Sequence, residues 1–233
     1  NHLIHTYSKP YIAFMDGIVM GGGMGISQGA SVRVVTERTK MAMPETNIGL
    51  FPDVGGGYFL SRCAGHLGEY LGLTGRMLQG REALSAGLAD GHIESQRLPK
   101  LWDSLGATPF ENGEAVQRWV ESHLQAQAPA APWPVDEVNT VFGLGSVPAM
   151  VAALGASGSE WAKETLQVLR QRSPLMLHVV LEQIRRAPSG RITAYWFVDG
   201  TPGAAVIDPV TGDPIPNLQY SALRGVSSTA RNT

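Results

Sequence analysis

The chain has 233 residues, 43% of them hydrophobic and 16% charged, and is therefore long enough to bury a sizeable core. Its formal net charge of -2 argues against a nucleic-acid-binding protein, because phosphate recognition needs a basic surface. No apolar run reaches the roughly 20 residues of a membrane-spanning helix, and the first residues lack the basic start and apolar core of a secretory signal.

The first hundred residues predict strands that alternate with helices. Strands are expected over residues 11–15, 18–20, 31–35, 39–43 and 92–94. Helices are expected after the glycines at 21–23 and over residues 54–60, 67–74 and 78–89. This alternation predicts an α/β architecture.

Beyond residue 99 the sequence predicts mainly helices. They are expected over residues 114–127, 146–154, 160–172 and 175–186, with an Ala/Pro-rich linker over residues 125–134. The last residues are rich in Gly, Pro, Ser and Thr and predict turns. We therefore divide the chain into a core at 1–98, a helical region at 99–187 and a divergent tail at 188–233 that we expect to be loosely packed or disordered.

Cys63 is the single cysteine, which excludes an intrachain disulfide and suits a reducing compartment. His66 lies close enough in sequence to activate it as a nucleophile, but a buried core cysteine is the more common situation. The six histidines show no His-Glu-x-x-His spacing and Cys-x-x-Cys is absent, so we expect no metal site.

Three consecutive glycines, Gly21, Gly22 and Gly23, follow a predicted strand. They let the backbone approach a ligand closely, and their N–H groups could stabilise a developing oxyanion. The alternative is tight packing of a strand on a helix without any ligand. The surrounding residues match neither a dinucleotide-binding fingerprint nor a phosphate-binding loop.

Two carboxylates, Glu45 and Asp53, stand among apolar and glycine residues in segment 43–57. Burial would raise the pKa of Glu45 and suit it for proton transfer or nucleophilic attack, whereas the alternative is an exposed loop residue. Asp53 precedes a predicted helix, so it could cap that helix, face a pocket, or do both. Their separation in sequence does not fix their distance. Together with the glycines, they indicate acyl chemistry at a polarised carbonyl.

These residues resemble the crotonase, or enoyl-CoA hydratase/isomerase, superfamily. Residues 9–23 resemble its oxyanion-hole segment, and residues 73–89 resemble its later helical signature. Residues 42–60, which read AMPETNIGLFPDVGGGYFL, are similar to the 3-hydroxyisobutyryl-CoA hydrolase branch, as is the helical part with Arg172-Ser-Pro.

The resemblance implies a partial ββα-spiral core followed by a helical C-terminal region. It implies hydrolysis of an acyl-CoA thioester, with the Gly22 N–H on the thioester oxygen, Glu45 attacking the carbonyl or activating water, and Asp53 as its proton partner. No metal or redox cofactor is implied, since CoA belongs to the substrate. Relatives commonly form trimers or hexamers, so the resemblance is compatible with a homo-oligomer. It implies a location in a bacterial cytoplasm or, in a eukaryote, in the mitochondrial matrix.

Gly25 departs from the hydratase pattern, in which a Glu stands two residues after the glycine triplet. This departure disfavours hydration of a double bond and disfavours isomerisation less; a catalytically silent protein that keeps the fold is the third alternative. The family's fold has about a hundred residues before Lys9. Because Met is absent at position 1 and the tail differs from the family's last helices, we expect the chain to be a fragment.

Overall fold

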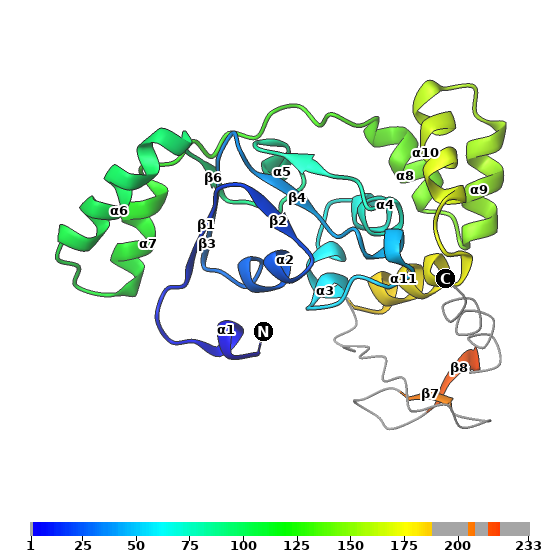
Figure 1. Cartoon of the computed structure of the whole chain (residues 1–233), viewed down its shortest axis with the longest axis horizontal. Helices are drawn as coiled ribbons and strands as arrows, with labels where there is room; N and C mark the ends of the chain where they lie inside the picture. Colours follow the sequence, from blue (N-terminus) through cyan, green and yellow to red (C-terminus); the bar gives the residue numbers. More distant parts are fainter. Residues whose placement is uncertain (1, 188–204, 208–213, 220–233) are drawn as a thin grey trace.

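The computed structural model of the protein describes residues 2–187, 205–207 and 214–219 (Figure 1). The strands are β1 (Ile12–Met15), β2 (Ile18–Met20), β3 (Val32–Val35), β4 (Lys40–Ala42), β5 (Leu78–Gln79), β6 (Gly91–His92), β7 (Ala205–Ile207) and β8 (Pro214–Gln219). The α-helices are α1 (His2–Thr6), α2 (Gly22–Ser27), α3 (Gly56–Leu60), α4 (Leu67–Thr74), α5 (Glu82–Ser85), α6 (Leu98–Ala107), α7 (Gly113–Glu121), α8 (Val135–Phe142), α9 (Val147–Ala156), α10 (Glu160–Arg170) and α11 (Pro174–Arg186). Two short 3₁₀ helices are η1 (Glu45–Ile48) and η2 (Ser95–Arg97).

The strands form two three-stranded sheets and one two-stranded sheet. The first has the order β1-β3-β6 and is parallel throughout, with Ile12 opposite Val32. The second has the order β2-β4-β5, in which β2 and β4 are parallel and β5 is antiparallel. β7 and β8 pair antiparallel. Strands β1 and β2 are therefore edge strands within the described part of the chain.

A bent two-strand unit occurs twice. β1 and β2 are joined by Asp16 and Gly17 but belong to different sheets, and β3 and β4 repeat this course beside them. Thr36 Oγ1 donates to Asp16 Oδ1 at 2.8 Å, and Thr39 Oγ1 donates to the Met15 carbonyl, so side chains link the two bends. The parallel stacking brings the carboxyl ends of β2 and β4 to the same edge.

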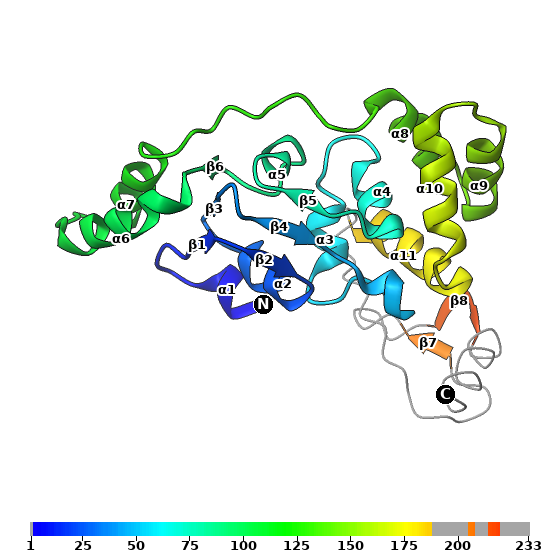
Figure 2. The same cartoon turned by 45° about the horizontal axis from the view of Figure 1, so that its top comes forward.

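Alternate side chains of the first sheet face different apolar clusters, as the period of a strand requires. Val32 and Val34 join the cluster under α6 and α7, whereas Met15 and Val35 join a larger cluster that includes residues of α3, α4 and α8–α11. The helices after Leu98 therefore fall into two groups at opposite ends of the molecule, joined by an extended segment (Figures 1 and 2).

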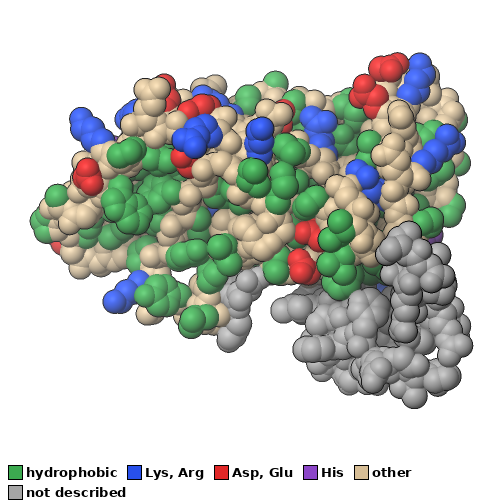
Figure 3. Space-filling model, viewed as in Figure 1, with side chains coloured by type: hydrophobic (Ala, Val, Ile, Leu, Met, Phe, Trp, Pro, Cys, Tyr) green, Lys and Arg blue, Asp and Glu red, His purple; other side chains and the backbone are tan. Residues whose placement is uncertain are grey.

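The end formed by α6 and α7 carries many hydrophobic side chains on the face shown in Figure 3. Trp102 of α6 is 64% exposed, although its ring packs edge-on against Phe14 of β1 with centroids 5.8 Å apart. The helix pair thus covers one face of the first sheet without burying its own apolar surface completely.

The predicted strands over the first 43 residues are confirmed, as is the α/β class. The helix predicted over 78–89 is wrong at both ends: Leu78 pairs with Met41 of β4, Gly80 turns the chain at φ 45° before α5, and α5 ends at Ser85. The helix predicted over 114–127 is also too long: α7 ends at Glu121, and the backbone of Gln125 pairs with that of His92.

From Leu98 to Arg186 the named elements are helices, including α6 and α8, for which the sequence reasoning gave no range. The boundaries at residues 98 and 187 stay a prediction. The expectation of a loosely packed tail at 188–233 falls outside the described residues, apart from β7 and β8. Among the residues that the structure describes, no helix is both long and apolar enough to cross a membrane.

Candidate active site

The carboxyl ends of β2 and β4 bring the glycine triplet and Glu45 together. The Gly21 N–H donates to the Ala42 carbonyl at 3.3 Å, and a Cβ placed on Gly21 would lie 3.0 Å from Glu45 Oε1. Gly21 also has a φ of 48°, which L side chains rarely adopt. Glycine is therefore needed at position 21 for its backbone conformation and for the approach of the Glu45 carboxyl group.

Glu45 is buried, with only 6% of its surface exposed. Burial raises the pKa of its carboxyl group, a hydrogen bond to its own backbone amide lowers it, and the charge of Asp53 raises it further. Within the described residues, Glu45 Oε2 has no hydrogen-bond partner. The alternative of an exposed loop residue is thus wrong. A buried carboxyl group of this kind can accept a proton or attack an electrophile.

Asp53 is exposed and lies in the loop between η1 and α3. Helix α3 begins at Gly56 with Gly55 as its N-cap and has no side-chain cap, so the interpretation of Asp53 as the capping residue is wrong. Asp53 contributes its carbonyl, which accepts from the Gly56 N–H at 2.7 Å. The charge of Asp53 is the smallest of the three causes that shift the pKa of Glu45, and it acts in the raising direction.

Gln183 on α11 holds the loop that carries Asp53. Its Nε2 donates to the Pro52 carbonyl at 2.7 Å, and a Cβ placed on Gly57 would lie 2.8 Å from Gln183 Cγ. The sequence reasoning missed this contact, because 131 residues separate Gln183 from Pro52. The sequence feature that could have indicated this contact is a polar residue on the apolar face of the predicted helix, seven residues after Met176.

Gly22 is the first residue of α2 and is exposed. A Cβ at this position would meet no atom within 4 Å, so open space lies beside it. The N–H groups in the first turn of a helix have no acceptor within the helix. The Gly22 amide is therefore suited to donate to a ligand oxygen.

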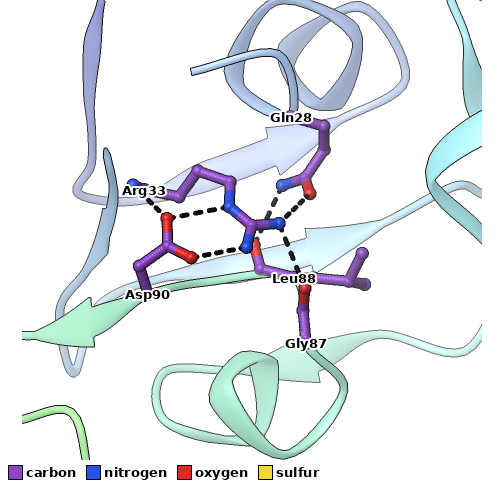
Figure 4. Close-up of polar contacts among 5 residues, drawn as sticks. All are labelled: Gln28, Arg33, Gly87, Leu88 and Asp90. Carbon is purple, nitrogen blue, oxygen red and sulfur yellow. Dashed lines mark hydrogen bonds and ion pairs between the residues drawn. The ribbon is translucent and has the colours of Figure 1, made fainter. Parts of the chain in front are cut away.

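The other end of α2 is anchored by Arg33 of β3 (Figure 4). Its guanidinium binds Asp90 through Nη2 to Oδ1 at 2.6 Å and Nε to Oδ2 at 3.0 Å. Nη1 donates to Gln28 Oε1 and to the Gly87 carbonyl, both at 3.0 Å. Gln28, the C-cap of α2, in turn donates to the Leu88 carbonyl at 3.0 Å. These bonds fix the helix that begins at the glycine triplet.

Cys63 is a buried core residue, which was the more common of the two situations considered from the sequence. Burial raises the pKa of its thiol to about 12, which disfavours the thiolate that a nucleophile requires. His66 does not serve it, because His66 Nδ1 pairs with Glu69 Oε1 at 3.0 Å. The hypothesis of a cysteine nucleophile is therefore wrong.

The Arg172-Ser-Pro motif caps the end of α4 and the start of α11. Arg172 Nη2 donates at 2.8 Å to the carbonyl of Thr74, the last residue of α4, and Ser173 Oγ accepts from the Met176 N–H at 3.5 Å as the N-cap of α11. Pro174 follows this cap as the first residue of α11. Burial lowers the pKa of Arg172, whose two bonds to one carbonyl compensate part of the desolvation.

An open pocket of about 420 Å³ lies near the amino ends of β1 and β3. Its lining includes Lys9, Ser31 and the start of α7, and none of Gly22, Glu45 and Asp53. We place the candidate site at the carboxyl ends of β2 and β4, because the buried carboxyl group lies there. Across the described ranges, no group of three or more His, Cys, Asp or Glu residues could hold a metal ion.

The model of the family described as enoyl-CoA hydratase/isomerase matches residues 1–196, a range that includes all three candidate site residues. The chain belongs to this family. The family membership and the crotonase-type fold agree with the expectation from residues 9–23 and 42–60.

Individual proteins extend this comparison. The chain is 42% identical over 195 residues to the mitochondrial 3-hydroxyisobutyryl-CoA hydrolase of Xenopus tropicalis, covering 81% of this chain and 51% of that protein. It is 42% identical over 209 residues to small ribosomal subunit protein mS47 of Neurospora crassa, covering 81% of this chain and 41% of that protein. The crystal structure of a carnitinyl-CoA dehydratase from Mycobacterium thermoresistibile is 39% identical with a TM-score of 0.72, covering 80% of this chain and 54% of that one. The chain thus spans about half the length of the proteins it matches.

Proposed function

We propose that this protein hydrolyses a short-chain acyl-CoA thioester, with 3-hydroxyisobutyryl-CoA as the substrate. The observation that carries the proposal is the buried Glu45 carboxyl group with its raised pKa, placed against Gly21. The similarity to a hydrolase named for this substrate supports the choice of acyl group. The reaction would be a step of valine breakdown, located in the mitochondrial matrix of a eukaryote or the cytoplasm of a bacterium.

In the proposed reaction the thioester oxygen accepts a hydrogen bond from the Gly22 N–H, which polarises the carbonyl. Glu45 as carboxylate either attacks the carbonyl carbon, which forms a mixed anhydride with its side chain, or removes a proton from the water that attacks the carbonyl. The C–S bond then breaks, and Asp53 helps to deliver a proton to the departing thiolate. In the first case water then hydrolyses the anhydride and regenerates Glu45, and in both cases the products are the free acid and CoA. A raised pKa makes the Glu45 carboxylate a stronger base for this step.

Two other functions are supported by single observations. The family description and the match to a carnitinyl-CoA dehydratase favour hydration or isomerisation of an enoyl-CoA, but Gly25 supplies no further carboxylate from α2. The match to a protein named as a ribosomal subunit favours an assembly protein without catalysis. The presence of Gly22, Glu45 and Asp53 together speaks for catalysis.

Release of free thiol from 3-hydroxyisobutyryl-CoA tests the proposal. We expect turnover by the chain and its loss in Glu45→Gln, whereas Glu164→Gln, an exposed residue of α10, should keep the rate. Circular dichroism confirms that each variant is folded. A folded wild-type chain that releases no thiol would contradict the hydrolase and favour the assembly protein. Water addition to a 2-enoyl-CoA without thiol release would favour the hydratase.

A further inference from the structure

Val54 packs closely against Gly25 where the loop that carries Asp53 meets α2. A Cβ placed on Gly25 would lie 2.4 Å from Val54 Cβ, 2.6 Å from its Cγ2 and 2.9 Å from its carbonyl oxygen. Real Cβ atoms essentially never come closer than 3.0 Å to another heavy atom. Because a β-carbon and a backbone oxygen are among these atoms and neither moves when the Val54 side chain rotates, no side-chain rotation relieves this contact. Position 25 therefore accepts only glycine while Val54 keeps its place.

Val54 is held in place against its own backbone preference. Its φ of 45° is the only positive φ of a non-glycine residue in the described part of the chain, and for a β-branched residue such a value is an outlier. The loop is fixed on both sides of Val54, through the Pro52 carbonyl bonded to Gln183 and the Asp53 carbonyl bonded to Gly56. The surrounding structure thus determines a conformation that the residue itself disfavours.

We propose that Val54 is a specificity-determining residue of the candidate active site, an inference that rests on the function proposed above. Its side chain fills the space that any side chain at position 25 would need. Gly25 lies one helical turn after Gly21, whose Cα faces Glu45. Gly25 also contacts Val54, the residue that follows Asp53. Helix α2 therefore cannot add a third carboxylate to the pair formed by Glu45 and Asp53.

Excluding a side chain from position 25 distinguishes two reactions of acyl-CoA thioesters. Hydration of a 2-enoyl-CoA adds the hydroxyl group of water to C3 and a proton to C2, so one group must activate water and another must supply the proton. Thioester hydrolysis forms a C–O bond at the carbonyl and breaks the C–S bond, with Glu45 and Asp53 on one segment of the chain. In the hydratase pattern one of the two groups that hydration needs is a Glu at position 25, and Val54 leaves no room for its side chain, so the site keeps the pair for hydrolysis and lacks the hydratase pair.

A double-mutant cycle of thermal stability tests the contact without any assay of activity. We expect Gly25→Ala to lower Tm by at least about 4 °C, and to lower it by less than half as much in a Val54→Gly background. Gly23→Ala is the matched control on the same helix, since its Cβ would meet only Val19 Cγ1 at 3.7 Å. Its Tm shift should be small and equal in both backgrounds. Equal losses for Gly25→Ala in both backgrounds would overturn the role of Val54.

The functional half of the inference is tested with Gly25→Glu and Val54→Gly, singly and combined. We expect the double variant to hydrate a 2-enoyl-CoA at least about tenfold faster than the wild type and than either single variant, which corresponds to about 1.4 kcal/mol. Coupled stabilities without this gain would overturn Val54 as a specificity determinant. Coupled stabilities and a wild-type chain that releases no thiol would overturn the hydrolase alone, so the two failures are distinguishable.

Discussion

Replacing Gln183 tests how firmly α11 holds the loop that carries Asp53. Gln183→Met keeps the length of the side chain but removes the 2.7 Å bond from Nε2 to the Pro52 carbonyl. Gln183→Glu keeps the shape and replaces the donor with an oxygen that faces that carbonyl. Because Gln183 is buried, with 8% of its surface exposed, water replaces the lost bond only in part.

The size of each effect follows from the partners of the two amide atoms. Leaving the Pro52 carbonyl without its donor costs about 1–3 kcal/mol of unfolding free energy. The Met variant also removes Gln183 Oε1, which lacks a partner among the described residues, and this recovers on the order of 1 kcal/mol. We therefore expect a net loss of about 1 kcal/mol for Met. An ionised Glu buried without a cation should lose roughly 3 kcal/mol or more at pH 7.

Urea unfolding followed by the fluorescence of the five tryptophans measures these losses. The pH dependence gives a second check: we expect burial to raise the pKa of the carboxyl group in the Glu variant, and the protonated group can donate to the Pro52 carbonyl. Its deficit should shrink as the pH falls toward 4. His178→Gln, on the exposed side of the same helix, should stay within about 0.5 kcal/mol of the wild type. Wild-type stability in both the Met and the Glu variant at pH 7 would refute the reasoning.

Three further predictions concern other groups. The pKa of Glu45 is raised above 4.5, so the native state binds its proton more tightly than the unfolded state does. This carboxyl group therefore lowers the free energy of unfolding as the pH rises past 4.5. In urea unfolding, Glu45→Gln should be more stable than the wild type at pH 8 and should lose that advantage near pH 4. The Cys63 thiol, with its pKa raised to about 12 from 9.0, should react with a thiol reagent about a thousandfold more slowly in the native than in the unfolded chain; equal labelling rates would contradict its burial. Arg33→Lys should lower the free energy of unfolding by about 1–3 kcal/mol, because a lysine cannot bind Asp90 and Gln28 at once; an unchanged urea midpoint would show that the network does not anchor α2.

Local sequence patterns predicted the elements whose causes are local. The apolar run before Asp16 forms β1, and the serine and proline at 173–174 start α11, because strand periodicity and helix capping act within a few residues. Leu78 shows the limit of this reasoning: the helical pattern after it is real, but pairing with Met41 takes the first residues into β5. A contact across 37 positions decided the structure there, and no window of neighbouring residues contains it.

The candidate site shows the same division. The glycine run and the apolar neighbours of Glu45 predicted a close backbone approach and a buried carboxyl group, and both are found. The conformation of Val54 and the bond from Gln183 were beyond sequence reasoning, since each depends on two segments meeting in space. The catalytic role of Glu45 stays a prediction that the thiol-release assay tests, and the roles of Asp53 and Gly22 also stay predictions.

The repeated bent unit of β1–β2 and β3–β4 joins the two parts of the candidate site through one backbone interface. Each unit bonds through its backbone to the next, as coils do in a solenoid, and stability then depends on nearest-neighbour interfaces. Gly22 follows the first unit and Glu45 the second, and the Gly21 N–H bonds to the Ala42 carbonyl across this interface. Local opening between β2 and β4 would therefore separate the proposed oxyanion donor from the carboxyl group while most of the core stays folded.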